Sequence, residues 1–152
     1  MAQRVDSRMV EISPFSPSDY DEVMALWRAT EGLTLRAADS REALTSYVAR
    51  NPGLSFVARD GGRLVAAVLA GTDGRRGYLQ HLAVAPAHRN QGLGSSLAKR
   101  VLRQLGALGV AKCHLFVRRE HMQARVFWER LGWTARDDVL LMSHTAADDA
   151  NA

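Results

Sequence analysis

The sequence has a single cysteine, Cys113, and no apolar run long enough to cross a membrane. One cysteine cannot form an intrachain disulfide or a cysteine zinc cluster, and such usage suits a reducing cytoplasm. The longest clean apolar run covers residues 64–70, far short of the roughly 20 residues that a membrane helix needs. No export signal is visible at the N-terminus. We therefore expect a cytoplasmic protein without a membrane span or a metal site, with Cys113 in the core.

Acidic residues are missing from the middle of the chain. Between Gly74 and Arg119 there are nine Lys/Arg and no Asp/Glu, whereas residues 1–73 hold eight Lys/Arg against ten Asp/Glu. The net charge of +4 is therefore concentrated in one region. Such a surface attracts an anionic ligand with phosphate groups, although a solvated basic face is the simpler interpretation of any single member such as Lys99. No nucleic-acid reading motif accompanies these charges, so we expect no nucleic-acid partner.

The 152 residues are 47% hydrophobic and 24% charged, which is the size and balance of one domain with its own core. No internal repeat or linker divides the chain. We expect a single domain over residues 1–152, with its core at about residues 10–143 and polar tails at both ends.

The most informative stretch runs from Leu82 to Leu97, where a strand pattern passes through a glycine loop into a helix pattern. The helix is predicted from apolar residues spaced by three or four, which are Leu93, Leu97, Val101, Leu105 and Leu108. The first N–H groups of a helix have no helical partner, so a loop placed there favours an anion. Gly92 and Gly94 lack a Cβ and let phosphate oxygens approach these amides.

Two familiar phosphate loops do not fit this stretch. A nucleoside-triphosphate loop ends in Gly-Lys-Ser/Thr, but the chain has Gly94-Ser95-Ser96, and a dinucleotide loop needs a third glycine where Leu97 stands. The pattern Arg89-x-x-Gly92-x-Gly94, preceded by Leu82-Ala83-Val84 and Pro86, instead resembles the acetyl-CoA motif of the GNAT superfamily of N-acetyltransferases.

The order of predicted elements extends this resemblance over nearly the whole core. A strand at residues 9–12 is followed by a helix after Pro17 and a second helix, capped at Asp39-Ser40, through residue 48. Strands at 54–59 and 63–69 flank an Asp60-Gly61-Gly62 hairpin turn. Further segments are a strand at 78–84, the motif helix, a strand at 112–117, a helix at 121–131 and paired last strands within 133–143. The resemblance implies an α/β GNAT fold, with a mixed, mostly antiparallel central sheet flanked by about four helices.

The resemblance also implies how acetyl-CoA is bound. Backbone amides near Leu82 to Val84 would line the pantetheine, and the glycine loop would hold the phosphates. The implied cofactor-binding residues are Leu82, Ala83, Val84, Arg89, Asn90, Gln91, Gly92, Leu93, Gly94, Ser95, His121 and Trp128.

Catalytic residues are harder to assign. In the family a Glu or His often stands four or six positions before the residue that is Val84 here, and this chain has Gln80 and Tyr78, either of which could orient a water. Histidine is a suitable residue type for a base, but strand alternation puts His81 on the opposite face from those two, so it is read as a packed or surface histidine.

Two further departures concern the late helix. The family's tyrosine acid is replaced by Trp128, whose indole N–H donates a hydrogen bond but does not release its proton. The usual asparagine is replaced by His121, a candidate for contact with the pantetheine or the sulfur. Tyr78, Gln80 and His121 are therefore the candidate catalytic residues.

The acceptor is expected to be a small-molecule or peptide amine. By resemblance, the segment between the first two helices borders the acceptor site, so Glu31 and Arg36 are candidate substrate contacts, although solvent-exposed charges explain them as well. The predicted function is acetyl transfer from acetyl-CoA to a primary amine, with a possible homodimer. A CoA-binding sensor without transfer is the main alternative, and a basic nucleic-acid module is a second.

Overall fold

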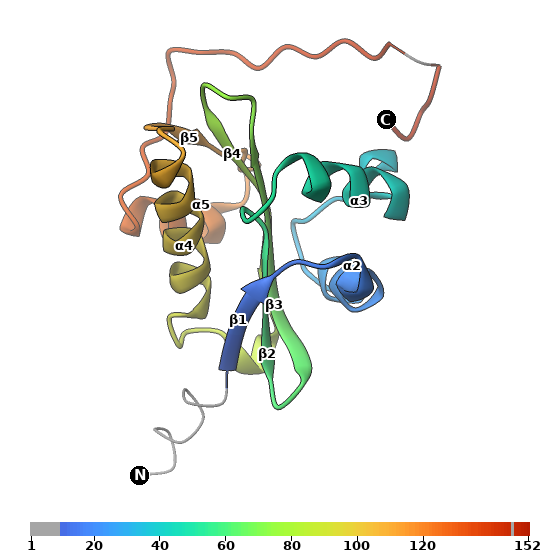
Figure 1. Ribbon diagram of the computed structural model, residues 1–152. Coiled ribbons are helices and arrows are strands. Elements are labelled where there is room, and N and C mark those ends of the chain that lie inside the picture. Colours follow the sequence, from blue (N-terminus) through green and yellow to red (C-terminus); the bar gives the residue numbers. More distant parts are fainter. Residues whose placement is uncertain (1–9, 147) are drawn as a thin grey trace.

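The computed structural model describes residues 10–146 and 148–152. A five-stranded sheet in the order β1-β2-β3-β4-β5 forms its centre (Figure 1). The first four strands are antiparallel, and β5 runs parallel to β4. Their bounds are β1 Val10–Pro14, β2 Phe56–Asp60, β3 Arg63–Thr72, β4 Gly77–Val84 and β5 Cys113–His114. The sequence thus correctly predicts a mixed, mostly antiparallel sheet; Met9, the predicted first residue of the first strand, lies outside the described residues.

Two pairs of helices cover the two faces of this sheet (Figure 1). Helices α2 (Tyr20–Arg28) and α3 (Arg41–Arg50) lie on one face, and α4 (Leu93–Ala107) and α5 (Met122–Arg130) lie on the other. Three short 3-10 turns precede helices: η1 (Pro17–Asp19), η2 (Ala37–Asp39) and η3 (Pro86–His88). The layers follow from the strand residues, because β3 is buried along most of its length and must be covered on both faces.

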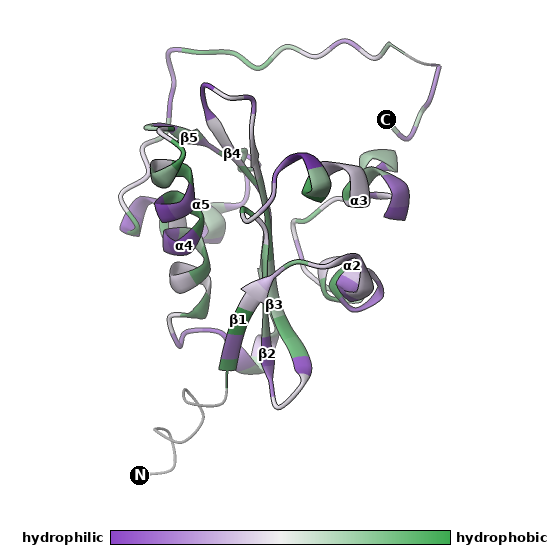
Figure 2. Cartoon of the chain, in the orientation of Figure 1, coloured by the Kyte–Doolittle hydropathy of each residue, from purple (hydrophilic) through white to green (hydrophobic). Residues whose placement is uncertain are grey.

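Each face of the sheet has its own hydrophobic core. Trp27 and Leu44, from α2 and α3, are buried in one core, and Leu97, Val101 and Leu105 of α4 are buried in the other. Figure 2 shows the same division as hydrophobic colouring on the central strands and hydrophilic colouring on the outer sides of the helices. Leu108, predicted to continue the apolar face of α4, instead lies just after the helix ends and is 61% exposed.

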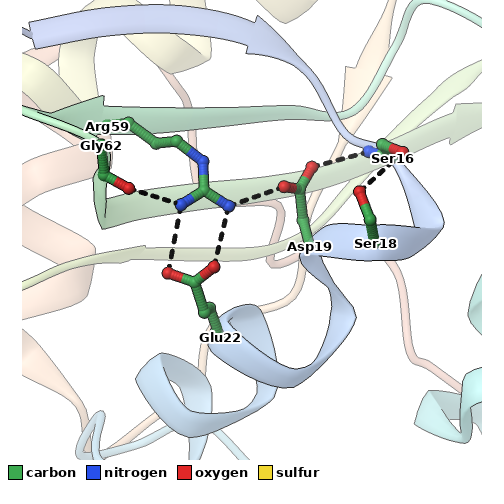
Figure 3. Close-up of polar contacts among 6 residues, drawn as sticks. All are labelled: Ser16, Ser18, Asp19, Glu22, Arg59 and Gly62. Atoms are coloured by element: carbon green, nitrogen blue, oxygen red, sulfur yellow. Dashed lines mark hydrogen bonds and ion pairs between the residues drawn. The ribbon is translucent and has the colours of Figure 1, made fainter.

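A charged network ties the start of α2 to the β2–β3 hairpin (Figure 3). Arg59 Nη2 donates to Asp19 Oδ1 at 2.7 Å and to Glu22 Oε1 at 3.0 Å, and its Nη1 donates to the carbonyl oxygen of Gly62 at 2.8 Å. The hairpin turn is the predicted one: Gly61 and Gly62 have φ of +56° and +86°, values that suit glycine. The network therefore fixes the first helix against the sheet.

The predicted last strands are not found. Between residues 133 and 143 the structure assigns no strand, and β5 has only two residues where six were predicted. Apolar side chains suit a strand, but a strand also needs a hydrogen-bonding partner, and β5 ends too early to provide one. The segment runs instead across the top of the view in Figure 1, and residues 139–142 are 62–85% exposed. Further toward the C-terminus, the carbonyl oxygen of Asn151 accepts from the N–H of Ala37 at 3.0 Å.

Candidate active site

The glycine loop forms an open helix N-terminus, as its sequence predicts. Gly92 is the N-cap residue of α4 with φ of +81°, and Asn90 has φ of +60°. No side chain caps this helix, and its first turn contains no acidic residue. The first amides of α4 are therefore left for an anion, which the helix dipole also favours.

Gly94 lies where α4 approaches α5 and β4. A Cβ placed on Gly94 would lie 3.3 Å from Phe127 Cζ on α5 and 3.6 Å from Val84 Cγ2 on β4. The glycine thus lets α4 approach both neighbours closely. On the strand side, Arg89 Nε donates to the carbonyl oxygen of Val84 at 2.9 Å, so this exposed arginine is held at the base of the loop.

Strands β4 and β5 diverge after a short stretch of pairing. They pair only at Gly77 with Cys113 and at Tyr78 with His114. A cavity of about 450 Å³ lies between the diverging segments. Its walls come from residues 30–34, residues 79–82 of β4, residues 115–118 after β5, and His121, Ala124 and Trp128 at and within α5. This volume is within the range of small-molecule sites.

Strand β4 carries a bulge at this cavity. Opposite β3, Val68 pairs with Leu82 but Ala70 pairs with Leu79, so β4 has one extra residue between these pairs. The extra residue reverses the alternation, because Leu79 belongs to the core under α4 and Ala83 to the core under α2. Gln80 and His81 consequently both line the cavity. The prediction that His81 faces away from the Gln80 side was wrong, because regular alternation does not continue through a bulge.

Comparison with known proteins agrees with this architecture. Residues 20–133 match the acetyltransferase (GNAT) family. An acetyltransferase of Sodalis glossinidius (strain morsitans) is 30% identical over 140 residues, covering 92% of this chain and 98% of that protein. An acetyltransferase of Yersinia enterocolitica is 30% identical over 139 residues, covering 91% and 98%. The chain belongs to the GNAT acetyltransferase family.

Solved structures show the same fold. The PaiA N-acetyltransferase from Thermoplasma acidophilum, solved in complex with coenzyme A, superposes with a TM-score of 0.76 at 19% identity, covering 84% of this chain and 91% of that one. The ribosomal-protein-S18-alanine N-acetyltransferase from Escherichia coli has a TM-score of 0.67 at 24% identity, covering 82% and 77%. The protein is thus a GNAT-type, acyl-CoA-dependent N-acetyltransferase. The family's use of acetyl-CoA explains the uncapped N-terminus of α4.

The structure separates the candidate catalytic residues of this GNAT domain. Gln80 and His121 line the cavity. Tyr78 does not; its hydroxyl donates to Asp73 Oδ2 at 3.3 Å, and its ring lies beside His114. Tyr78 is therefore badly placed to act on a substrate in this cavity, because it points to the other side of the β4–β5 junction.

The candidate acceptor contacts also differ from each other. The loop of residues 30–34, which includes Glu31, forms one wall of the cavity. Arg36 is not among the lining residues; its backbone N–H donates to Asp39 Oδ2 at 2.9 Å. Across the cavity, Arg118 Nη2 donates to Thr34 Oγ1 at 2.7 Å and joins the loop to the segment after β5.

Sequence reasoning missed one functional candidate, Asp39. The sequence predicts a helix cap at Asp39-Ser40. Ser40 provides this cap by accepting from the N–H of Ala43, whereas Asp39 Oδ1 lies 2.9 Å from His81 Nε2. No local pattern joins two residues 42 positions apart. Cys113, by contrast, behaves as predicted: partial burial raises the pKa of its thiol to about 11, so it stays protonated at neutral pH.

Two absences complete the site. Within residues 10–146 and 148–152, no three His, Cys, Asp or Glu side chains gather as a metal-binding group. In the same part of the chain, none of the helices is both long and apolar enough to span a bilayer.

Proposed function

We propose that this enzyme transfers the acetyl group of acetyl-CoA to a primary amine of a small molecule or peptide, and that both substrates meet in the cavity between β4 and β5. The observation that supports this most strongly is the bulge in β4 at a cavity, on the strand that precedes the uncapped N-terminus of α4. A bulge turns backbone groups out of the sheet, where a thioester carbonyl can use them as hydrogen-bond donors.

The residues present fit acetyl-CoA. The pyrophosphate is assigned to the amides of residues 90–95, with Arg89 as the nearby cation, because the α4 N-terminus is uncapped and lacks acidic side chains. The pantetheine is assigned to Leu82, Ala83 and Val84, which lead from the loop to the cavity. Trp128 and His121 line the cavity and would meet the thioester end.

The acceptor side is assigned to the loop of residues 30–34. Glu31 lies on this wall, and a carboxylate attracts a protonated amine. Proteins with the same fold include an aminoglycoside acetyltransferase from an uncultured soil sample, the S18-alanine enzyme, and Arabidopsis thaliana Naa50 solved with a bisubstrate analogue that contains a peptide. Both classes of amine therefore remain candidates for this cavity.

Trp128 on α5 stands where the family has a tyrosine, and this difference concerns the departure of the thiol leaving group. Trp128 is 9% exposed and its ring lies 4.9 Å from that of Phe127 and 5.2 Å from that of Trp133, so it serves as part of the core. A thiol with a pKa near 8.5 leaves as a thiolate without an obligatory acid. The absence of the family tyrosine at this position is therefore compatible with turnover. A CoA-binding sensor is the alternative, and it predicts binding without release of thiol.

Calorimetric titration with acetyl-CoA, followed by thiol release with spermidine, an aminoglycoside and a peptide with a free N-terminus, tests this proposal. Gly94→Glu puts a carboxylate into the anion site and should abolish measurable binding. Gly106→Glu changes the same residue type near the other end of α4, where a Cβ meets nothing within 4 Å, and should leave affinity unchanged. Binding without thiol release supports the sensor, and absence of binding overturns the proposal.

We also propose a homodimer. The exposed apolar segment 139–142 supports it, since four consecutive large apolar side chains are rarely left in water. Light scattering of the wild type and of Leu140→Glu tests this: a dimer that becomes a monomer is expected, and a monomeric wild type excludes it. A cytoplasmic location remains a prediction from the single cysteine.

A further inference from the structure

His81 is held in the cavity wall by a buried carboxylate. Asp39 lies in η2, where its side chain is 8% exposed; its Oδ1 lies 2.9 Å from His81 Nε2 and its Oδ2 accepts from the N–H of Arg36 at 2.9 Å. Tyr20 Oη donates to the carbonyl oxygen of Asp39 at 2.8 Å, so the turn itself is fixed. The Trp27 ring meets the imidazole edge to face, with centroids 4.9 Å apart. The imidazole thus has a defined orientation.

The ionisation of Asp39 decides which ring nitrogen of His81 carries the proton. Burial by itself would raise the pKa of Asp39, but the hydrogen bonds from His81 and the Arg36 amide hold it below its ordinary value. An ionised carboxylate only accepts hydrogen bonds, so Nε2 of a neutral His81 must be the donor. Nδ1 then carries the free lone pair. In the portion of the chain that the structure describes, this atom has no hydrogen-bond partner and is not among the buried unsatisfied atoms.

We infer that His81, oriented by Asp39, is the general base that removes a proton from the acceptor amine. This inference rests on the proposed function and adds the residue that performs its proton transfer. The bulge in β4 makes it possible, because it places His81 in the same cavity as Gln80 and His121.

The acetyl transfer begins with deprotonation of the acceptor amine. His81 Nδ1 takes one proton from the ammonium R–NH3⁺, which leaves a neutral amine. The amine nitrogen attacks the thioester carbonyl carbon and forms the C–N bond. The C–S bond breaks, and its electron pair leaves on sulfur. The second proton of the nitrogen goes to the thiolate, which becomes CoA-SH, and imidazolium His81 returns its proton to solvent.

Other charged groups face the same cavity and must be distinguished from His81. Glu31 comes from the loop before η2, Arg118 from the segment after β5, and His121 from the start of α5. His121 packs on Gly32, and no carboxylate partner for its ring is found within the described part of the chain. His81 is therefore the histidine of the cavity with a fixed tautomer. His121→Gln removes the other histidine of the cavity and serves as a comparison in the pH profile.

The chain offers a matched pair outside the cavity. His88 Nε2 lies 2.8 Å from Asp60 Oδ2. The side chain of His88 is as exposed as that of His81, and the side chain of Asp60 is slightly more exposed. His88 Nδ1, however, is buried without a partner in the described residues, so no substrate reaches it. Asp60→Asn thus breaks the same kind of pair without touching the proposed base.

The experiment measures thiol release at pH 6–10 with the best amine of the panel, alongside acetyl-CoA affinity. His81→Gln should lower kcat about 100-fold near pH 7, as expected for loss of a general base, with acetyl-CoA affinity unchanged. The loss should shrink toward pH 10, because the amine then loses its proton to solvent. Asp39→Asn should lower kcat at least about tenfold, because the imidazole of His81 is then no longer held in the Nε2–H tautomer. Asp60→Asn should keep wild-type kcat.

A second readout does not depend on turnover. Nitrogen-15 NMR of the labelled imidazoles should show His81 as the Nε2–H tautomer, and Asp39→Asn should change that pattern. An active wild type whose kcat is unaffected by His81→Gln, or a His81 with its proton on Nδ1, overturns the inference while the proposed function stands. An inactive wild type that binds acetyl-CoA overturns the proposed function, and the base role with it.

Discussion

His121 lies directly against Gly32: a Cβ placed on Gly32 would be 2.9 Å from both Cε1 and Nδ1 of the imidazole. Gly32 also has φ of +81°, a conformation that L side chains rarely adopt. This contact holds the loop of residues 30–34 against the start of α5. The cavity walls formed by this loop and by α5 thus meet at Gly32.

The first prediction follows from this contact. Gly32→Ala should displace His121 or the loop and raise the KM for the amine severalfold, measured by steady-state thiol release. Gly53→Ala is the matched control, because Gly53 has φ of +73° but a Cβ there meets nothing within 4 Å. Both variants should lose about 1–2 kcal/mol of stability from the left-handed backbone. Equal KM values for the two would contradict a role for the His121 contact.

Arg89 should contribute to acetyl-CoA affinity through its charge and its hydrogen bonds. Arg89→Met should weaken binding about tenfold, which corresponds to loss of one charge-assisted contact worth about 1.5 kcal/mol. Arg103→Met removes an exposed arginine within α4, ten residues beyond its first residue, and should leave the affinity unchanged. Calorimetric titration with acetyl-CoA at two salt concentrations measures the affinity of both variants. Equal losses of affinity would show that only the overall positive charge of this region matters.

Asp39 should make the stability of the fold depend on pH in the acid range. Its pKa is lower in the folded state than in the unfolded chain, so its contribution is present above the ordinary carboxyl pKa near 3.9 and is lost as pH falls through the folded value. The melting temperature of wild type should therefore exceed that of Asp39→Asn at pH 7, and the gap should be smaller at about pH 3.

Asp138 provides the comparison for this acid effect. Its pKa is lowered to about 2 by the Arg136 guanidinium, but its side chain is 64% exposed, and water screens such a pair. Asp138→Asn should change the melting temperature little at either pH. A gap for Asp39→Asn that stays constant with pH would show that the carboxylate is not the stabilising form.

The Arg59 network should stabilise the fold more than an ordinary surface pair. Arg59→Met leaves Asp19, whose side chain is 11% exposed, without its cation, and should cost about 2 kcal/mol in denaturant unfolding. Arg125→Met breaks an exposed pair between residues one helical turn apart on α5 and should change the free energy of unfolding little. Similar costs for the two would mean that the partial burial of Asp19 has no effect.

The sequence by itself determined the family, the order of elements up to α5, and the glycine loop, because these depend on local periodicity and on residues close together in the chain. The hairpin at Gly61 and the uncapped start of α4 are local in the same sense. The prediction of the last strands from the sequence pattern was wrong. Apolar residues favour a strand, but they do not provide the neighbouring strand edge with which it must pair.

Only the tertiary structure decided what lines the cavity. The bulge in β4 depends on its register with β3, so strict alternation placed His81 on the wrong face. The partner of His81 comes from a turn 42 residues away, and it meets the imidazole only because α2 and α3 pack on that face of the sheet. Side chains distant in sequence are brought together by burial of apolar surface, and no local spacing records which of them will meet.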